Sequence, residues 1–427
     1  MRFECSLEEY KKYKLGELVE NVVAGATPKT SVDDYWNGGD IPWLSSGEVH
    51  KKFIYFTDKF ITSEGYNNSS TKIVPTNSVL IALAGQGKTR GTVAINKIEL
   101  CTNQSIASII PNEMLNYKYL FYYLESKYEY LRALSSSDGG RGGLNLKLIR
   151  SIPIQVPSIK EQENISNFIN EIDKKILLLE QKHKLYDDFK KYLMQQIFTQ
   201  KLRFDFKDTW DKVLLKDVAF IPKKTKLTNV EGLKLLTVKL HTKGIEINDR
   251  IKPKLTKRGR PYYIRRSGEL LIGRQNFHNG GMGIVPKSLD GGICSNAISS
   301  FNVFEDKIDV NYLYYFLARP EYYIKSERLI GGTGQKEFSE KELLKLKIDL
   351  PSLEEQNKIV DFLLNIDHKI ELSENQLNKT QEFKKGLLQQ MFVVRINWQC
   401  NFKLAKSPSF NKHLLILKNK IIFIIIK

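Results

Sequence analysis

The chain has 427 residues, a length at which a single hydrophobic core usually divides, so we expect at least two domains. Its 66 Lys and Arg residues against 48 Asp and Glu residues give a formal net charge of +18, which favours a polyanionic partner and salt-dependent binding. Nucleic acid is the first candidate, and an ordinary basic protein from an AT-rich genome is the alternative.

The cysteines and the apolar segments argue against several other classes. Four cysteines lie far apart with no C-x-x-C pair, at Cys5, Cys101, Cys294 and Cys400, so neither a zinc site nor a disulfide framework is predicted. Residues 1–14 lack the apolar core of a signal peptide, and the apolar run 421–426 is far shorter than the roughly 20 residues of a membrane span. We therefore expect a cytoplasmic protein.

The first globular unit is assigned to residues 1–150. Strand-like runs alternate with glycine-rich turns, as at 78–84 and 85–91, which predicts an α/β (α+β) unit with a twisted, partly antiparallel sheet. The glycine-rich stretch 139–143 either lets the backbone approach a phosphate or connects flexibly to the following segment. Several side chains are candidates for DNA contact, the cations for phosphates and the amide for a base edge: Lys72, Gln86, Lys88, Arg90 and Arg141.

A first long helix is assigned to residues 151–203. Ser158 and Glu161 have the spacing of a capping box, which predicts a helix start. Apolar residues then recur at alternating spacings of four and three, the period of a coiled-coil seam: Ile165, Ile169, Ile172 and Ile176. His183 and Lys190 fall on the same seam and weaken its later part.

The second globular unit is assigned to residues 204–344, and a cluster of basic side chains sets it apart. Its candidates for DNA contact are interleaved with aromatic and amide groups: Lys257, Arg258, Arg260, Tyr262, Arg265, Arg266, Arg274, Gln275 and Asn276. Cations meet phosphates, flat rings stack or wedge, and amides bond base edges, so this composition suits a nucleic-acid surface. A solvated charged loop is the alternative.

A second long helix is assigned to residues 345–398, followed by an unassigned tail, 399–427. Residues 157–198 align without a gap to residues 351–392, with 19 of 42 positions identical, so the chain contains an internal repeat. Ser352 and Glu355 repeat the capping box, and the second seam consists of Ile359, Leu363, Ile366 and Ile370. Ser373 and Lys384 weaken that seam as His183 and Lys190 weaken the first.

Each predicted helix is about 40 residues, or roughly 60 Å, long. Because the two seams match, we expect the helices to pack on one another; packing of each on its own globular unit is the alternative. Looser similarity upstream, between 117–124 and 310–317, extends the repeat into the globular units. The predicted order is therefore globular unit, helix, globular unit, helix, in a pseudo-twofold repeat.

The sequence lacks the signatures of several enzymes. Residues 84–89 (AGQGKT) resemble the end of a phosphate-binding loop, but Ala82 stands where its first glycine is required. We find no G-x-S-x-G elbow and no Asn/Asp-Pro-Pro-aromatic signature of adenine methyltransferases, and the six histidines are scattered. We therefore predict no catalytic, cofactor or metal residues in this chain.

The run GDIPWLSSGE at 39–48, the helix openings PSIKEQ at 157–162 and PSLEEQ at 351–356, and the two-copy order resemble type I restriction-modification specificity subunits. The resemblance covers residues 13–392. It implies that the globular units are target recognition domains, that the helices form an antiparallel coiled coil, and that Trp43, Ser45 and Ser46 are further candidates for DNA contact.

The same resemblance implies a bipartite, asymmetric double-stranded DNA target with one half-site per unit. Two methyltransferase subunits and the restriction subunits would be the partners, and S-adenosylmethionine, ATP and Mg would be bound there. The expected spacer-helix and docking residues are Glu161, Gln162, Ile165, Ile169, Ile172, Ile176, Glu355, Gln356, Ile359, Leu363, Ile366 and Ile370. A coiled-coil scaffold that binds proteins and has no DNA specificity is the competing hypothesis.

Overall fold

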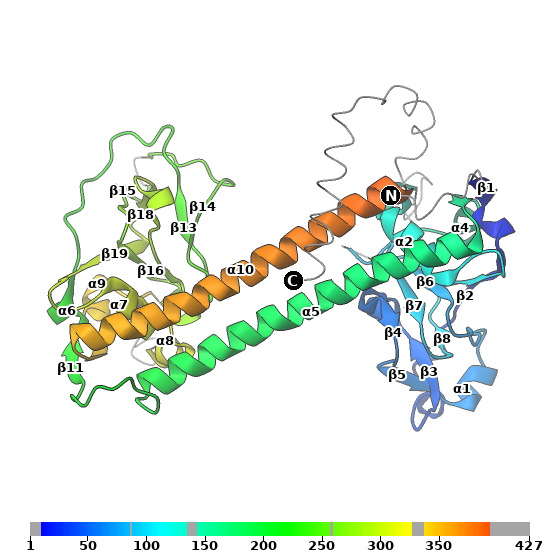
Figure 1. Ribbon diagram of the computed structural model, residues 1–427, viewed down its shortest axis with the longest axis horizontal. Coiled ribbons are helices and arrows are strands. Elements are labelled where there is room, and N and C mark those ends of the chain that lie inside the picture. The colour runs from blue at the N-terminus through cyan, green and yellow to red at the C-terminus, as the bar shows by residue number, and fades with distance from the viewer. Residues whose placement is uncertain (1–9, 86–87, 135–142, 257–258, 327–336, 393–427) are drawn as a thin grey trace. The chain divides into compact units, whose positions relative to one another are not determined.

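The computed structural model describes residues 10–85, 88–134, 143–256, 259–326 and 337–392 (Figure 1). Its internal contacts divide the chain into two units. Unit 1 comprises residues 1–178 and 376–427, and unit 2 comprises residues 179–375. Each unit therefore contains half of each long helix.

Unit 1 contains two sheets of three or more strands. The larger has the order β2-β9-β6-β7-β4, with β2 (Val19–Ala24), β9 (Ile106–Pro111), β6 (Val79–Ala82), β7 (Val93–Asn96) and β4 (Phe53–Ile54). The smaller has the order β5-β3-β8, with β5 (Lys59–Ile61), β3 (Ile41–Leu44) and β8 (Cys101–Thr102). Every residue of β6 and β7 is buried, which explains their continuous apolar runs. Most pairings are antiparallel, but β4–β7 and β3–β8 are parallel, so the predicted partly antiparallel sheet is present.

Unit 2 has smaller sheets. One has the order β12-β19-β16-β17, with β12 (Ala219–Phe220), β19 (Ile298–Val303), β16 (Leu270–Gly273) and β17 (Met282–Ile284). Two antiparallel pairs accompany it: β13 (Leu236–Val238) with β14 (Ile245–Ile247), and β15 (Tyr262–Ile264) with β18 (Ile293–Ser295). The two units therefore differ in sheet topology.

A common substructure stands at the base of each unit. In unit 1, β1 (Lys11–Lys14) pairs with β10 (Pro153–Val156), and in unit 2, β11 (Asp211–Leu214) pairs with β20 (Lys347–Leu350). The apolar helices α2 (Tyr117–Ser126) and α7 (Val310–Leu317) bond to these pairs in the same way. Tyr119 donates its hydroxyl to the Gln155 carbonyl at 2.8 Å, and Tyr312 donates to the Asp349 carbonyl at 2.6 Å. We call this substructure the junction frame.

Short helices complete the two units. They are α1 (Ser63–Asn67), α3 (Tyr128–Leu134) and α4 (Leu146–Arg150) in unit 1, and α6 (Leu215–Val218), α8 (Pro320–Ser326) and α9 (Glu340–Leu343) in unit 2. None of the helices in the described part of the chain is both long and apolar enough to cross a membrane.

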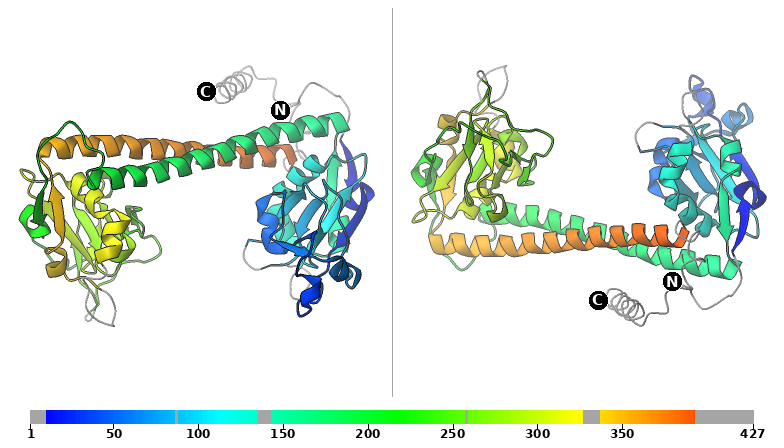
Figure 2. Two further views of the ribbon diagram at one scale, coloured as in Figure 1. Left: turned by 90° about the horizontal axis from the view of Figure 1, so that it is seen from below. Right: turned by 90° about the horizontal axis from the view of Figure 1, so that it is seen from above.

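The two long helices are α5 (Ile159–Phe198) and α10 (Leu353–Phe392), each of 40 residues. Both are drawn as unbroken helices in the two further views (Figure 2). The predicted capping box is half right for α10, because the Ser352 hydroxyl accepts the Glu355 N–H at 3.3 Å. Its acidic half is wrong, because the Glu355 carboxylate accepts hydrogen bonds from Arg203 and Trp210 instead.

Inside each unit, the two helices share one hydrophobic cluster with the globular core. In unit 1, Ile165 and Ile169 of α5 lie in a cluster with Leu388 and Met391 of α10. In unit 2 the cluster contains the end of α5 and the start of α10. Leu193 and Ile197 of α5 lie in it with Ile359 and Leu363 of α10. Seam residues of both helices therefore belong to the same cluster as the globular core of each unit.

Candidate nucleic-acid interface

In unit 1, the strand β3 ends in the short 3-10 helix η3 (Ser46–Lys51), which contains the end of the GDIPWLSSGE run. Trp43 is only 5% exposed, and its indole N–H donates to the Ala26 carbonyl at 3.1 Å. Its ring meets Trp36 edge-on, at 5.1 Å between centroids. Trp43 is thus a core residue that fixes the strand, and its burial argues against the expected contact with DNA.

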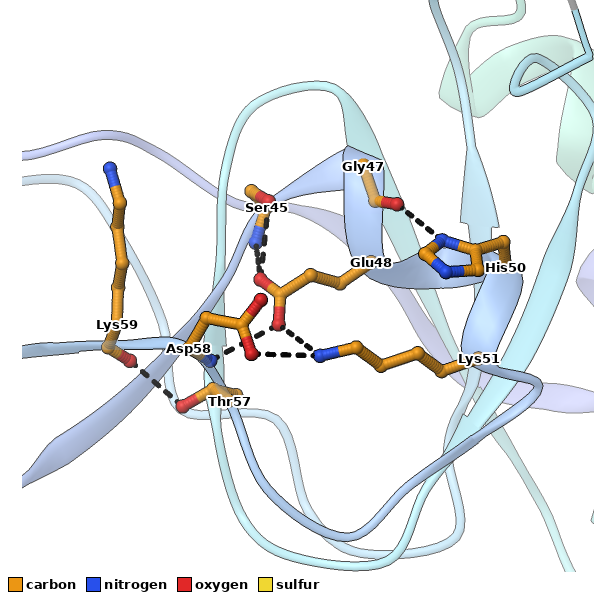
Figure 3. Close-up of polar contacts among 8 residues, drawn as sticks. All are labelled: Ser45, Gly47, Glu48, His50, Lys51, Thr57, Asp58 and Lys59. Atoms are coloured by element: carbon orange, nitrogen blue, oxygen red, sulfur yellow. Dashed lines mark hydrogen bonds and ion pairs between the residues drawn. The ribbon is translucent and has the colours of Figure 1, made fainter. Parts of the chain in front are cut away.

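A single carboxylate holds the loop that follows (Figure 3). Glu48 is 6% exposed, and its Oε2 accepts hydrogen bonds from the backbone N–H and the hydroxyl of Ser45, both at 3.1 Å. Its Oε1 accepts from Lys51 Nζ at 3.0 Å and from the Asp58 N–H at 3.1 Å. Lys51 also bonds Asp58 at 2.9 Å and thereby lowers the pKa of that carboxyl. Glu48 therefore ties together two chain segments ten residues and more apart.

This brace presents two large aromatic side chains to solvent. Tyr55 and Phe56 are 65% and 64% exposed, and we call them the aromatic tip. The ammonium of Lys51 lies 4.9 Å from the centre of the Phe56 ring. An exposed aromatic pair beside a lysine, on a loop with fixed ends, has the chemistry of a base-stacking or wedging element. Sequence reasoning missed it, although Ser45 and Glu48 have the same capping-box spacing as the helix starts.

A pocket of about 410 Å³ is lined in part by this loop. The predicted Lys88 lines it together with His50, Lys52, Glu125 and Tyr128. Lys52 has a φ of 60°, an unusual conformation for a residue other than glycine, and bonds Glu125 at 2.8 Å.

The other predicted residues of unit 1 are more scattered. The predicted Lys72 is exposed, and Arg90, Ser45 and Ser46 are half-buried. Gln86 and Arg141 lie outside the described residues. Ser45 and Ser46 thus stay candidates, with Ser45 already bonded to Glu48.

In unit 2, the predicted Arg265 is buried, with 1% of its side chain exposed. Its guanidinium donates to the Ser300 hydroxyl at 2.8 Å and to the Ile298 carbonyl at 3.1 Å. Glu269 lies 3.9 Å away, and burial raises the pKa of its carboxyl although Arg265 opposes the shift. Arg265 is thus part of the internal framework of the sheet, and the prediction that it contacts DNA is not supported by its position.

A turn between β18 and β19 brings two other predicted regions of unit 2 together. The Asn296 N–H donates to the Pro261 carbonyl beside Tyr262, and the Arg274 N–H donates to the Ala297 carbonyl, both at 3.1 Å. Tyr262 is half-buried on β15.

Acidic residues form ion pairs with part of the basic cluster. Glu337, far away in the sequence, bonds Arg274 at 2.5 Å and Gln275 at 3.3 Å. The exposed Arg266 lies 3.5 Å from Asp290. Of the remaining predicted residues, Arg260 and Asn276 are exposed. Lys257 and Arg258 lie outside the described residues.

Two glutamines expected at a docking surface are instead fully buried in the junction frames. Gln162 donates to the carbonyls of Met114 and Pro157, both at 3.0 Å, and accepts the Asn116 N–H at 2.9 Å. Gln356 donates to the carbonyls of Lys307 and Pro351 at 3.1 and 2.9 Å and accepts the Asp309 N–H at 2.9 Å. Both amides join the start of a long helix to the N-cap of α2 or α7, so they have an internal role.

The neighbouring glutamates also make hydrogen bonds within their own units. Glu355 is 1% exposed and accepts from Arg203 at 2.8 and 3.0 Å and from the Trp210 indole at 3.1 Å, which raises the pKa of Arg203. Glu161, at the equivalent position of unit 1, accepts the Tyr10 hydroxyl at 2.7 Å. Glu355 is therefore internal, whereas Glu161 is half-buried and its docking role stays a prediction.

Large apolar side chains are exposed elsewhere on the helices. In unit 2, one face of α5 carries Leu185, Phe189 and Tyr192, exposed by 68%, 49% and 56%. Their spacing of four and three residues places them on one stripe of the helix, away from the buried seam. The seam periodicity gives no sign of them, because they lie on another stripe of the helix.

The chain is similar in sequence to specificity subunits over nearly its whole length. The family model described as type I restriction modification DNA specificity domain matches residues 7–185 and again 207–382. The MjaVIII specificity subunit of Methanocaldococcus jannaschii is 24% identical over 413 residues, which cover 91% of this chain and 93% of that protein. The Escherichia coli EcoR124I/EcoR124II specificity subunit is 29% identical over 151 residues, which cover 35% of this chain and 37% of that protein.

Solved structures share the fold. The S subunit of a type I system from M. genitalium superposes with a TM-score of 0.57 at 14% identity, covering 92% of this chain and 98% of that chain. A chain from a structural study of complex assembly and conformational transition in the type I system gives a TM-score of 0.54 at 16% identity, covering 90% and 97% of the two chains. With both repeats matched by the family model, the chain belongs to the type I restriction-modification DNA specificity family, whose members recognise DNA and are not themselves catalytic.

Proposed function

We propose that this chain reads a bipartite, asymmetric DNA target, one half-site with each globular unit, and directs adenine methylation or cleavage by partner subunits. The observation that carries this proposal is the repeat: two units with the same junction frame but different sheets and loops. Identical frames suit a common attachment to the long helices, and different loops suit the reading of different bases.

Within each unit, the contact with DNA is assigned to exposed side chains at the loops. In unit 1 these are the aromatic tip and the cations Lys72 and Lys88; in unit 2 they are Arg260 and Asn276. Cations bind phosphates and position the duplex, whereas amides and aromatic rings address bases. The net charge of +18 supports a polyanionic partner.

The helices α5 and α10 form one antiparallel coiled coil in this proposal. Its support lies inside each unit, where the first half of one helix packs beside the last half of the other. A paired strut of this kind suits half-sites on successive accessible grooves, which recur about every 34 Å.

Two methyltransferase subunits and the restriction subunits are the proposed partners. The exposed apolar stripe Leu185, Phe189 and Tyr192 is the docking candidate that replaces Gln162 and Gln356. S-adenosylmethionine, ATP and Mg would be bound by the partners. In the described part of the chain, no group of three or more His, Cys, Asp or Glu side chains is arranged to hold a metal ion.

Adenine methylation profiling of the host genome, with and without this gene, tests the proposal. We expect one bipartite motif to lose methylation when the gene is deleted, and an unchanged profile in cells that express the partners would contradict it. Replacing residues 13–150 by another recognition domain should change one half of that motif and leave the other half unchanged.

The competing scaffold hypothesis makes a different prediction about binding. A scaffold without DNA specificity would show no affinity for duplex DNA that falls as salt rises. Filter binding of the purified chain to duplex DNA at two salt concentrations therefore separates the two hypotheses, since phosphate contacts weaken steeply with salt.

A further inference from the structure

In unit 1, a lysine on the apolar seam of α10 is buried in a cluster of charges. Lys384 is 6% exposed, and its ammonium lies 2.8 and 2.9 Å from the two carboxylate oxygens of Asp173 on α5. It also bonds Glu125 of α2 at 2.7 Å and lies 5.2 Å from the centre of the Tyr122 ring. The polar residue that weakens the seam in the sequence is thus fully partnered.

In unit 2, the equivalent residues make the equivalent contact. Lys190 of α5 lies 2.5 Å from the carboxylate of Asp367 on α10 and 5.2 Å from the centre of the Tyr315 ring. The Tyr315 hydroxyl donates to the same carboxylate at 2.6 Å. Each unit therefore contains a lysine of one helix, an aspartate of the other helix and a tyrosine of the junction frame.

The repeat relates the two clusters residue by residue. Asp173 aligns with Asp367 and Lys190 with Lys384, and both positions are identical in the two copies. Lys190 lies 17 positions after Asp173 on α5, and Lys384 lies 17 positions after Asp367 on α10. One antiparallel register of the two helices therefore satisfies both ion pairs at once.

A charged residue on a seam selects one register in a way that apolar residues do not. Leucine and isoleucine pack acceptably after a shift by one heptad, whereas a lysine on the seam that moves with its helix loses the aspartate of the other helix. A heptad shift moves one helix by about 10.5 Å along the other. That distance is close to three base pairs of a duplex at about 3.4 Å per base pair.

We propose that Lys190–Asp367 and Lys384–Asp173 lock the register of α5 against α10 and thereby fix the number of base pairs between the two half-sites. This inference rests on the proposed function. It assigns these four side chains a positioning role: they set spacing, whereas the loops of each unit read sequence.

The test uses the full chain assembled with its methyltransferase subunits, after the motif has been found by methylation profiling. Duplexes carry the same two half-sites, separated by the native spacer or by spacers up to three base pairs shorter or longer. The readouts are the rate of methylation and the affinity for each spacer. The variant is the double substitution Lys190→Met and Lys384→Met, which keeps side-chain length and removes both charges.

We expect the wild-type complex to prefer one spacer by at least tenfold and the double variant to lose most of that preference, while both half-sites are still required. Lys191→Met with Lys385→Met, one residue further along in both copies and exposed, is the matched control and should keep the preference. A second variant exchanges one pair, Lys190→Asp with Asp367→Lys, and should restore the selectivity that Asp367→Lys alone removes.

The outcomes separate the two claims. A wild-type complex that modifies neither half-site contradicts the proposed function itself. A wild-type complex that reads both half-sites, together with a folded double variant of unchanged spacer preference, overturns the register lock. If the double variant does not fold, the exchanged pair decides: no recovery over Asp367→Lys alone overturns the proposal.

Discussion

In unit 1 the start of the long helix is held by Gln162, and in unit 2 by Gln356, through the same three kinds of hydrogen bond. The strands above these amides differ, with a five-stranded sheet in unit 1 and a four-stranded sheet in unit 2. The repeat is therefore strictest where a unit joins its helix and loosest where loops reach solvent. The two copies are thus alike where they attach to the long helices and differ in their sheets.

We expect the largest effect from removing one of the two buried amides, because it should destabilise one unit and leave the other unchanged. We expect Gln356→Ala to destabilise unit 2 by about 2–3 kcal/mol, because it leaves two carbonyls and one N–H without partners in a buried place. Hydrogen exchange should quicken in α7 and the start of α10, but not in α2. Gln162→Ala should do the reverse. Gln195→Ala, an exposed glutamine on α5, is the control and should change neither; equal exchange in both units would contradict separate junction frames.

The aromatic tip has no counterpart assigned in unit 2, so its removal should affect one half-site only. We expect the double variant Tyr55→Ala and Phe56→Ala to weaken binding to the target roughly tenfold or more, since base stacking contributes about 1–3 kcal/mol per base. Fluorescence anisotropy with duplexes mutated in either half-site measures this effect. Tyr130→Ala, another exposed aromatic residue of unit 1, serves as the control. Unchanged affinity of the tip variant would remove the tip from the interface.

Acid should weaken the charge cluster of unit 1, which contains the carboxyl of Glu125. Burial opposes the charge of Glu125, but Lys384 and Lys52 hold the pKa of its carboxyl below the ordinary value of 4.5. A lowered folded-state pKa adds stability above about pH 4.5, and that stability is lost as the pH falls through the folded-state value. We expect Glu125→Gln to lower the melting temperature at pH 7 by about 2–4 °C and to have less effect at pH 4. An equal loss at both values of pH would contradict this assignment.

Charge removal at the basic cluster of unit 2 should give the smallest change. Arg260→Gln should weaken DNA binding a few-fold and reduce the slope of log affinity against log salt by about 0.9, the value for one phosphate contact. Arg265→Gln, by contrast, should lower the stability of unit 2, because the guanidinium is buried against Ser300 and Ile298. Titrations at three salt concentrations, with melting curves for both variants, separate a surface cation from a framework cation.

Much of the fold could be predicted from the sequence because it depends on periodicity and repetition. The apolar spacing from Ile165 to Ile176 marks a helix whatever lies next to it, and the structure has 40 helical residues there and in the second copy. The candidate site was harder to predict, because exposure depends on partners far away in the sequence. Arg265 and Arg274 look alike in a run of basic residues, yet Arg265 is buried and donates to Ser300, whereas Arg274 pairs with Glu337.

The helix openings show the same difficulty. The run PSxxEQ was a sound indicator of where the helices begin, but the roles of its Glu and Gln depend on Asn116, Asp309 and Arg203, which lie 46 to 152 residues away. The brace at Glu48 was within reach of sequence reasoning, because Ser45 and Glu48 have capping-box spacing.

That brace has a consequence for how new specificities arise. The Glu48 carboxylate accepts hydrogen bonds from both Ser45 and Asp58. The two ends of the intervening loop are therefore held whichever side chains stand at positions 55 and 56. Substitutions in the aromatic tip leave the hydrogen bonds of Glu48 in place and carry little risk of misfolding. On the proposed function, a substitution at Tyr55 or Phe56 would change which bases the loop contacts without changing how its ends are held.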